Sequence, residues 1–256
     1  MGAALNSVFT VSDVRRLAKS VFSITFDAPE LASRAEPGQF VHIKCGHSRP
    51  LRRPFGISDV CGGKLTVVFE VRGEGTKWLA ASAPGRRVDI NGPLGRGFSE
   101  TNGNILVVGG GLGAAPLLFA ARRARESGGV TAVLGFRGIS NAVLTDKFES
   151  VCYGVFVTTE DGSSGLRGTV ALPLEELLKT GKYSAVLSCG PRAMLKSVAE
   201  LCERAGARCE AALEERMGCG VGACLVCVCK TKKNGVETMS RVCRDGPVFD
   251  AREVVW

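Results

Sequence analysis

The first hundred residues carry short runs of alternating or β-branched apolar positions, which is the pattern of half-buried strands. Turn residues such as Pro37-Gly38 and Gly92-Pro93 separate these runs. Short strands at such regular spacing predict a small antiparallel β-barrel, with one helix at residues 76–82. The predicted strands cover residues 8–14, 20–26, 40–44, 64–71 and 88–91.

From about residue 104 the pattern changes to apolar strands that alternate with helices, which is typical of a parallel sheet with helices on both faces. The predicted strands cover 105–108, 131–135, 154–158 and 185–188, and the predicted helices cover 114–126, 143–149, 174–180 and 192–205. The expected fold class is multi-domain: an antiparallel β-barrel over 1–100, an α/β parallel-sheet nucleotide domain over 101–208 and a small C-terminal domain over 209–256.

Residues 105–121 are uncharged over seventeen positions and so imitate a membrane span. Several glycines and Pro116 interrupt them, so a buried strand, a glycine turn and the start of a buried helix explain the stretch better. The N-terminal residues have neither the charged flank nor the long apolar core of a signal peptide. We therefore expect a soluble protein with no membrane partner.

The composition indicates the redox compartment and the kinds of partner to expect. The 256 residues include eleven cysteines, five of which fall within residues 219–243. A secreted disulfide scaffold would be shorter and would spread an even number of cysteines, so we expect a reducing, cytoplasmic compartment and a local metal site. The net charge of +8 fits either a solvated basic surface or basic rims around anionic dinucleotides. With 6% aromatic residues and no Lys/Arg block among them, we expect no nucleic-acid partner.

The most specific motif consists of four cysteines near the C-terminus. The first three follow the C-x4-C-x2-C spacing of a plant-type [2Fe–2S] cluster, and fifteen residues separate the third from the fourth. Glycines at 218, 220 and 222 would let the chain curl around a small cluster and leave N–H groups free for its sulfides. The fourth is expected to close the site from a neighbouring strand. The predicted ligands are Cys219, Cys224, Cys227 and Cys243.

Two alternatives concern the same segment. Cys229 competes for a ligand position, but its neighbours Val228 and Lys230 have the pattern of a strand, so we expect a packing thiol. A zinc site usually combines paired C-x2-C motifs. Cys224 and Cys227 form one such pair, whereas Cys243 has no partner nearby, which favours the cluster over zinc.

A glycine-rich turn stands between a predicted strand and helix. Gly109, Gly111 and Ala114 fit G-x-G-x-x-A, and Gly113 lies inside the same turn. Such a turn lets the backbone approach a phosphate, and the helix start supplies free N–H groups. The alternative is a tight turn without a ligand, and no acidic residue stands clearly at the end of the second strand to hold a ribose.

Two further motifs suit cofactor binding. Cys189-Gly190-Pro191 follows another predicted parallel strand, where residues line the ligand crevice of an open sheet; the alternative is a buried thiol in a turn. In the barrel, Arg53 could pair with a pyrophosphate, as could Gly75 and Thr76 at a helix start. A surface arginine and an ordinary turn are the alternatives.

The sequence has two histidines, His42 and His47, which we interpret as structural or surface residues. We find no histidine–carboxylate arrangement and assign no catalytic residue.

Together these motifs resemble the electron-transfer subunits of type B dihydroorotate dehydrogenase, within the ferredoxin–NADP reductase superfamily. The resemblance covers nearly the whole chain and is most specific at residues 214–224 and 242–249. The other motifs that carry it are at 37–41, 53–57, 73–76, 92–95, 109–116, 134–137, 161–163 and 189–191.

The resemblance implies a barrel that binds FAD, an α/β domain that binds NAD and a C-terminal domain with a [2Fe–2S] cluster. Gly56 stands where the family usually has Ser, and Phe69-Glu70 stands where it usually has Tyr-Arg, which removes a cation near the flavin phosphates. The implied flavin contacts are Arg53, Pro54, Phe55, Gly56, Val68, Phe69, Glu70, Gly75 and Thr76. The implied nicotinamide-nucleotide contacts are Gly109, Gly111, Gly113, Ala114, Cys189, Gly190 and Pro191.

The implied function follows from electron counting. A nicotinamide exchanges two electrons and a cluster one, so a flavin that does both must stand between them. In the family, a separate FMN-bearing subunit oxidises dihydroorotate in pyrimidine biosynthesis, in a heterotetramer, and electrons pass through the cluster and FAD to NAD⁺. The alternatives are a reductase subunit of sulfhydrogenase or ferredoxin:NADP oxidoreductase type, in which Arg137 would read a 2′-phosphate, and a zinc-stabilised nucleotide-binding module.

Overall fold

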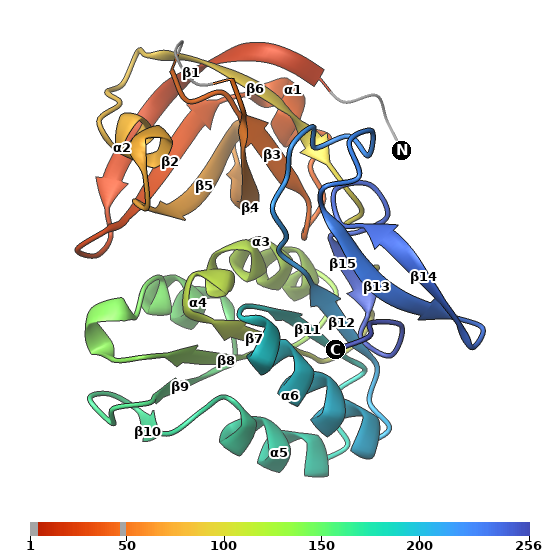
Figure 1. Ribbon diagram of the computed structural model, residues 1–256. Coiled ribbons are helices and arrows are strands. Elements are labelled where there is room, and N and C mark those ends of the chain that lie inside the picture. Colours follow the sequence, from red (N-terminus) through yellow and green to blue (C-terminus); the bar gives the residue numbers. More distant parts are fainter. Residues whose placement is uncertain (1–4, 47–49) are drawn as a thin grey trace.

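The computed structural model describes residues 5–46 and 50–256, so His47 lies outside the described residues. The N-terminal part is a closed antiparallel barrel, seen at the top of Figure 1, with strand order β1-β2-β5-β4-β3-β6. This confirms the predicted barrel. Its elements are β1 (Leu5–Arg16), β2 (Val21–Asp27), α1 (Pro29–Ala32), β3 (Phe40–Ile43), β4 (Arg53–Cys61), β5 (Lys64–Glu70), α2 (Glu74–Ala80) and β6 (Arg87–Leu94).

Strand β4 was not among the predicted strands. It contains Pro54 and Gly56, both of which weaken the strand pattern in a sequence. The barrel accommodates them by pairing β4 with β3 on one side and β5 on the other. Residues 53–61 therefore form a full strand of the barrel.

The second part is a seven-stranded sheet of order β10-β9-β8-β7-β11-β12-β15. Its core strands are parallel, as predicted, but β15 pairs antiparallel with β12, so the sheet is mixed. Helices flank this sheet in the lower half of Figure 1. The elements are β7 (Ile105–Gly110), α3 (Ala114–Arg125), β8 (Val130–Phe136), α4 (Thr145–Val151), β9 (Gly154–Thr159), β10 (Leu166–Arg167), α5 (Ala171–Lys179), β11 (Ala185–Cys189), α6 (Arg192–Arg204), β12 (Cys209–Ala212) and β15 (Val248–Asp250).

The cysteine-rich segment lies between β12 and β15 and forms a loop and a hairpin, drawn in blue in Figure 1. The hairpin pairs β13 (Val228–Lys233) with β14 (Val236–Arg241). Cys243 was expected on a strand, but it lies in the turn just after β14. The chain ends against the hairpin, since the Val255 N–H donates to the Lys230 carbonyl over 3.1 Å.

Buried contacts join the barrel to the sheet. The Ser58 hydroxyl on β4 donates to the Ala115 carbonyl at the start of α3 over 2.9 Å. A Cβ placed on Gly56 would lie 3.1 Å from Pro116 Cβ, so β4 and α3 approach closely because residue 56 is glycine. Among the described residues, no helix is long and apolar enough to cross a membrane.

Candidate electron-transfer site

The predicted pyrophosphate residues of the barrel lie together. A Cβ on Gly75 would sit 3.3 Å from Arg53 Nε, so the guanidinium rests on the first turn of α2. The Thr76 hydroxyl accepts N–H groups from Arg72 and Gly73 over 2.9 and 3.1 Å and donates to the Gly73 carbonyl. It therefore caps its own helix, which leaves backbone N–H groups and Arg53 as the contacts available to a phosphate.

The other predicted flavin residues divide by burial. The side chains of Phe55, Val68 and Phe69 are buried, and the Phe55 and Phe69 rings pack with centroids 5.6 Å apart. Only their main chain could contact a cofactor. Pro54 and Gly56 are partly exposed on β4, so that strand presents a surface to the outside of the barrel.

Glu70 stands where the resemblance expected a cation. Its carboxylate is 2.7 Å from Arg72 Nε and also accepts the Ser20 hydroxyl over 3.4 Å. Arg72 thus supplies a positive charge two residues after position 70.

In the α/β part, two predicted turns contact each other through their backbones. A Cβ on Gly113 would lie 2.5 Å from the Cys189 carbonyl oxygen, and one on Gly109 would lie 2.8 Å from Ala114 Cα. Gly110, which was not predicted as a site residue, has no room for a Cβ beside Pro191 and Met194. Gly111 has φ +53° and nothing within 4 Å of its Cβ position, so its open side can admit a phosphate.

Strand register collects further groups at the carboxyl end of the sheet. Cys189 on β11 pairs with Gly109 on β7 and with Ala212 on β12. Burial raises the pKa of the Cys189 thiol well above its ordinary value. The thiol is therefore uncharged and lines the site, and it is not a nucleophile.

Glu214 follows β12, and motif reading did not assign it a role. Its side chain is exposed, yet desolvation by neighbouring protein atoms raises its pKa, while the charge of Arg72 lowers it. Cys189 and Arg72 are both within its electrostatic reach, so Glu214 lies where the barrel faces the end of the sheet.

No acidic residue follows β8, the second strand of this part, but one follows its neighbour β9. Asp161 follows β9, and its carboxylate leaves no room for a Cβ on Gly138 after β8. The Ser163 hydroxyl donates to Asp161 Oδ1 over 2.6 Å, and this bond lowers the pKa of Asp161. The Asp161-Gly162-Ser163 motif was the available signal, but only the pairing of β8 with β9 brings it beside Gly138.

The cysteine loop is curled by its glycines, two of which have positive φ: Gly220 at +73° and Gly222 at +85°. Backbone N–H groups of Val221, Ala223 and Cys224 donate to Cys219 Sγ over 3.4, 3.2 and 3.4 Å. Burial raises the pKa of Cys219, but these N–H groups, together with a hydrogen bond from the Cys224 thiol, outweigh it and lower the pKa to about 6. The loop therefore stabilises a thiolate before any metal is considered.

The four predicted ligands come together as two pairs. Cys219 and Cys224 interact through their side chains, and so do Cys227 and Cys243, where burial and the neighbouring thiol raise the pKa of Cys243 to about 12. In the described part of the chain, no three His, Cys, Asp or Glu side chains are grouped to hold one metal ion. Two thiols for each of two irons is what a [2Fe–2S] cluster needs, so the residues fit that cluster better than a single tetrahedral zinc.

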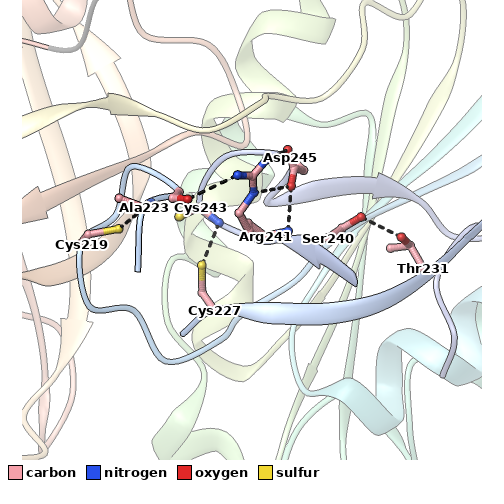
Figure 2. A network of polar contacts seen from close by, with 9 residues as sticks. Cys219, Ala223, Cys227, Thr231, Ser240, Arg241, Cys243 and Asp245 are labelled. Atoms are coloured by element: carbon pink, nitrogen blue, oxygen red, sulfur yellow. Dashed lines mark hydrogen bonds and ion pairs between the residues drawn. The ribbon is translucent and has the colours of Figure 1, made fainter. Parts of the chain in front are cut away.

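Figure 2 shows how the second pair is braced. Arg241 holds Asp245 through two side-chain hydrogen bonds of 2.9 and 3.1 Å, and its third arm donates to the Gly222 carbonyl over 3.3 Å. The Cys243 N–H in the same turn donates to Cys227 Sγ over 3.4 Å. The Arg241–Asp245 pair thus fixes the turn that carries Cys243 against the loop that carries Cys219.

Cys229 belongs to β13 and is buried opposite Ser240 of β14. Burial raises its pKa to about 11. The expectation that it packs within a strand agrees with this position, while its exclusion from the cluster stays a prediction.

Solved structures share this architecture. The structure of an NADH-dependent reduced ferredoxin-NADP oxidoreductase, studied for flavin-based electron bifurcation, superposes with a TM-score of 0.86 at 31% identity, over 100% of this chain and 91% of that one. A ferredoxin NADP⁺ reductase from Neisseria gonorrhoeae with bound FAD and NADP superposes at 0.65, with 16% identity over 78% of this chain and 92% of that one. The fold and site thus define an oxidoreductase of the ferredoxin reductase type with a C-terminal iron–sulfur segment.

Sequence comparison is more specific. Residues 214–255 match the iron-sulfur cluster binding domain of dihydroorotate dehydrogenase B. The dihydroorotate dehydrogenase B (NAD(+)) electron transfer subunit of Caldanaerobacter subterraneus subsp. tengcongensis is 42% identical over 94% of this chain and 95% of that protein, and that of Geobacillus thermodenitrificans is 38% identical over 96% and 97%. The chain belongs to this family of electron transfer subunits, which confirms the resemblance seen in its motifs.

Proposed function

We propose that this chain passes electrons between a [2Fe–2S] cluster, FAD and NAD(H), and that it serves a partner subunit that oxidises dihydroorotate on FMN, as a heterotetramer in the cytoplasm. The observation that carries the proposal is the paired arrangement of four cysteines in a segment that matches the iron-sulfur domain of this family. The free cysteines support a reducing compartment.

The barrel, residues 1–100, is the proposed FAD domain. Bound FAD exchanges both single electrons and hydrides, which lets it link a cluster to a nicotinamide. Arg53 and the backbone at Gly75 would hold the pyrophosphate, because they lie side by side. Strand β4 would lie along the ring system through Pro54 and Gly56, whose faces are partly exposed.

The proposed nicotinamide domain covers residues 101–208. The open side of Gly111 and the start of α3 would hold the pyrophosphate, and Gly113 would keep the turn at Cys189-Gly190 in place. Glu214 would contribute a carboxylate where the barrel faces the end of the sheet. Asp161 would accept a hydrogen bond from a ribose hydroxyl, and its charge favours NAD over a phosphorylated ribose.

The proposed cluster domain, residues 209–256, offers one face to the partner. Cys224 is exposed, and three apolar side chains on the same loop are open to solvent: Leu225 at 61%, Val226 at 56% and Val221 at 48%. Exposed apolar groups of this kind mark an interaction surface. Because they surround a cluster ligand, a docked partner would exchange electrons over a short distance.

Anaerobic purification tests the cofactors. We expect iron, sulfide and FAD in the purified protein, and a paramagnetic signal after reduction. Cys224→Ser should remove the cluster signal and leave NADH reduction of FAD, while Cys61→Ser, an exposed thiol on the barrel, should leave both unchanged. Stoichiometric zinc without iron would refute the proposal.

Co-purification with an FMN-bearing dihydroorotate dehydrogenase subunit tests the partner. The complex should reduce NAD⁺ with dihydroorotate, and NADH should reduce the flavin faster than NADPH. The second candidate is a reductase subunit of the ferredoxin-NADP oxidoreductase kind, which the whole-chain similarity to that structure favours. Flavin reduction by NADH in a complex without activity toward dihydroorotate would support this second candidate.

A further inference from the structure

His42 is a buried histidine that the proposed function does not use. It lies on β3, is 1% exposed, and neither ring nitrogen has a hydrogen-bond partner in the part of the chain that the structure describes. An unsatisfied buried polar group costs about 1–3 kcal/mol, so its retention calls for a partner that comes with a ligand.

Strand register directs the ring out of the barrel. Val41 pairs with Phe55 and fills the barrel core, whereas His42 pairs with Pro54 on the opposite face of the same strands. Phe40, the next residue on that outer face, belongs to the apolar cluster that contains Cys227 and Cys243. The outer face of β3 therefore packs against the cysteine segment.

The ring contacts the cysteine loop itself. A Cβ on Gly220 would lie 2.6 Å from His42 Nδ1, so the loop reaches the imidazole only because residue 220 is glycine. The backbone of Cys219 is also close enough to affect the ring, although it does not make a hydrogen bond of good geometry. His42 thus stands between β4, the proposed flavin strand, and the first ligand of the loop.

Side-chain contacts fix the main chain that carries His42. Arg52 is held by Asp89 through bonds of 2.8 and 2.9 Å and donates to the His42 carbonyl over 3.4 Å. Whether neutral or protonated, an imidazole has at least one ring N–H to donate.

We propose that His42 is a positioning residue of the electron path, which holds the cysteine loop against β4 and donates its ring N–H to a sulfur of the bound cluster. The inference rests on the proposed [2Fe–2S] function. Hydrogen bonds to cluster sulfurs are among the factors that set the potential. Loss of this donor removes stabilisation of the more negative, reduced cluster.

The test is an EPR-monitored redox titration of the purified holoprotein. His42→Phe keeps an aromatic ring but loses the N–H, and we expect about a tenfold shift of the one-electron equilibrium toward the oxidised cluster, equal to about 59 mV. His42→Asn keeps a donor and should restore most of the wild-type potential, with equal iron content in all three proteins. Equal potentials, or equal shifts in both variants, would overturn the proposal, because a donor role requires the Asn and Phe variants to differ, and a packing role would be kept better by Phe than by Asn.

A second measurement needs no His42 variant. The sequence has two histidines, so ¹⁵N-histidine labelling of a His47→Gln protein leaves His42 as the labelled residue. Pulsed EPR of the reduced cluster should then detect a ¹⁵N coupling, and its absence would overturn the proposal. A protein without iron in these experiments would contradict the proposed function, whereas an intact cluster without the coupling would contradict only the role of His42.

Discussion

Cysteines that lie close together in the sequence have different surroundings in the structure. Cys219 receives three backbone N–H groups and has its pKa lowered to about 6, whereas Cys229, ten residues on, is packed in a hairpin with its pKa raised to about 11. A ligand binds as a thiolate, and the loop favours that form at Cys219, whereas burial disfavours it at Cys229 and also at the predicted ligand Cys243. The predicted exclusion of Cys229 therefore rests on its place in the hairpin.

The positions of Cys227, paired with Cys243, and of Cys229, in the hairpin, predict the outcome of two alanine substitutions. Cys227→Ala should abolish the cluster, measured as bound iron and as the EPR signal of the reduced protein. Cys229→Ala should keep the iron and lower the free energy of unfolding by about 1 kcal/mol, because it leaves only a small cavity. Loss of iron from the Cys229 variant would mean that the ligand set is wrong.

Asp161 allows a prediction about pH. Its pKa lies below the ordinary value of 3.8 because the Ser163 hydroxyl and N–H donate to the carboxylate. A depressed folded pKa contributes stability above pH 3.8, and that contribution is lost as the pH falls through the folded pKa. Ser163→Ala should raise the pKa of Asp161 toward 3.8 in an NMR titration, with the exposed Ser140→Ala as control. An unchanged pKa in the Ser163 variant would contradict this account.

Some residues of the candidate site could be predicted from the sequence and others could not. Spacing alone predicted that Cys219, Cys224, Cys227 and Cys243 would come together, because three of them lie within nine residues. Glu214 could not be assigned in this way. Its environment depends on Arg72, which is remote in sequence and approaches only when the barrel meets the sheet.

At the scale of elements, two turns at the carboxyl end of the sheet act as one unit. Gly113, the residue just before α3, has an ordinary helical φ of −62°, so glycine is required there by space and not by conformation. The backbone at Cys189 and Gly190 occupies the position that a side chain would take. A change in one turn must therefore move the other.

Gly113→Ala should lower the free energy of unfolding by about 1–3 kcal/mol through overpacking and should raise the KM for NADH in flavin reduction. Gly206→Ala is the matched control, because φ is +66° and its Cβ position is open. The control should lose about 1–2 kcal/mol through backbone strain and keep its KM. An unchanged KM in the Gly113 variant would mean that the two turns do not cooperate in binding.

Most elements could be predicted from periodicity, from the strand over 105–108 to the helix over 192–205. Strand β4 could not, because Pro54 and Gly56 interrupt its pattern and only pairing on both sides makes it a strand. β15 has three residues, too few to show a period, and its antiparallel direction depends on the whole path of the cysteine segment.

At the scale of the whole molecule, Arg192 connects the turn at Cys189–Pro191 to the C-terminal residues. It follows Pro191, donates to the Val255 carbonyl over 2.8 Å and lies 6.0 Å from the centre of the Trp256 ring. Its other nitrogen is 3.9 Å from Glu215, at the entry to the cysteine segment. One side chain therefore contacts both ends of that segment.

Arg192→Ala should loosen the C-terminal residues, because the Val255 carbonyl loses its donor. We expect a loss of about 1 kcal/mol, or about 2–4 °C in the melting temperature of a chain this size. Limited proteolysis should cleave the C-terminal segment faster. Lys196→Ala removes an exposed ion pair on the same helix. It should lower the free energy of unfolding by no more than about 0.5 kcal/mol and leave the rate of proteolysis unchanged. Equal proteolysis of both variants would contradict the role of Arg192.

The pairing of β15 with β12 means that the chain leaves the sheet and returns to its immediate neighbour, through Glu210 with Asp250 and Ala212 with Val248. Both ends of the cysteine segment are consequently anchored at the same edge of the sheet. The segment therefore cannot rotate about a single hinge. Deleting the last ten residues would remove β15, the edge strand of the sheet. The unpaired edge of β12 could then pair with other chains.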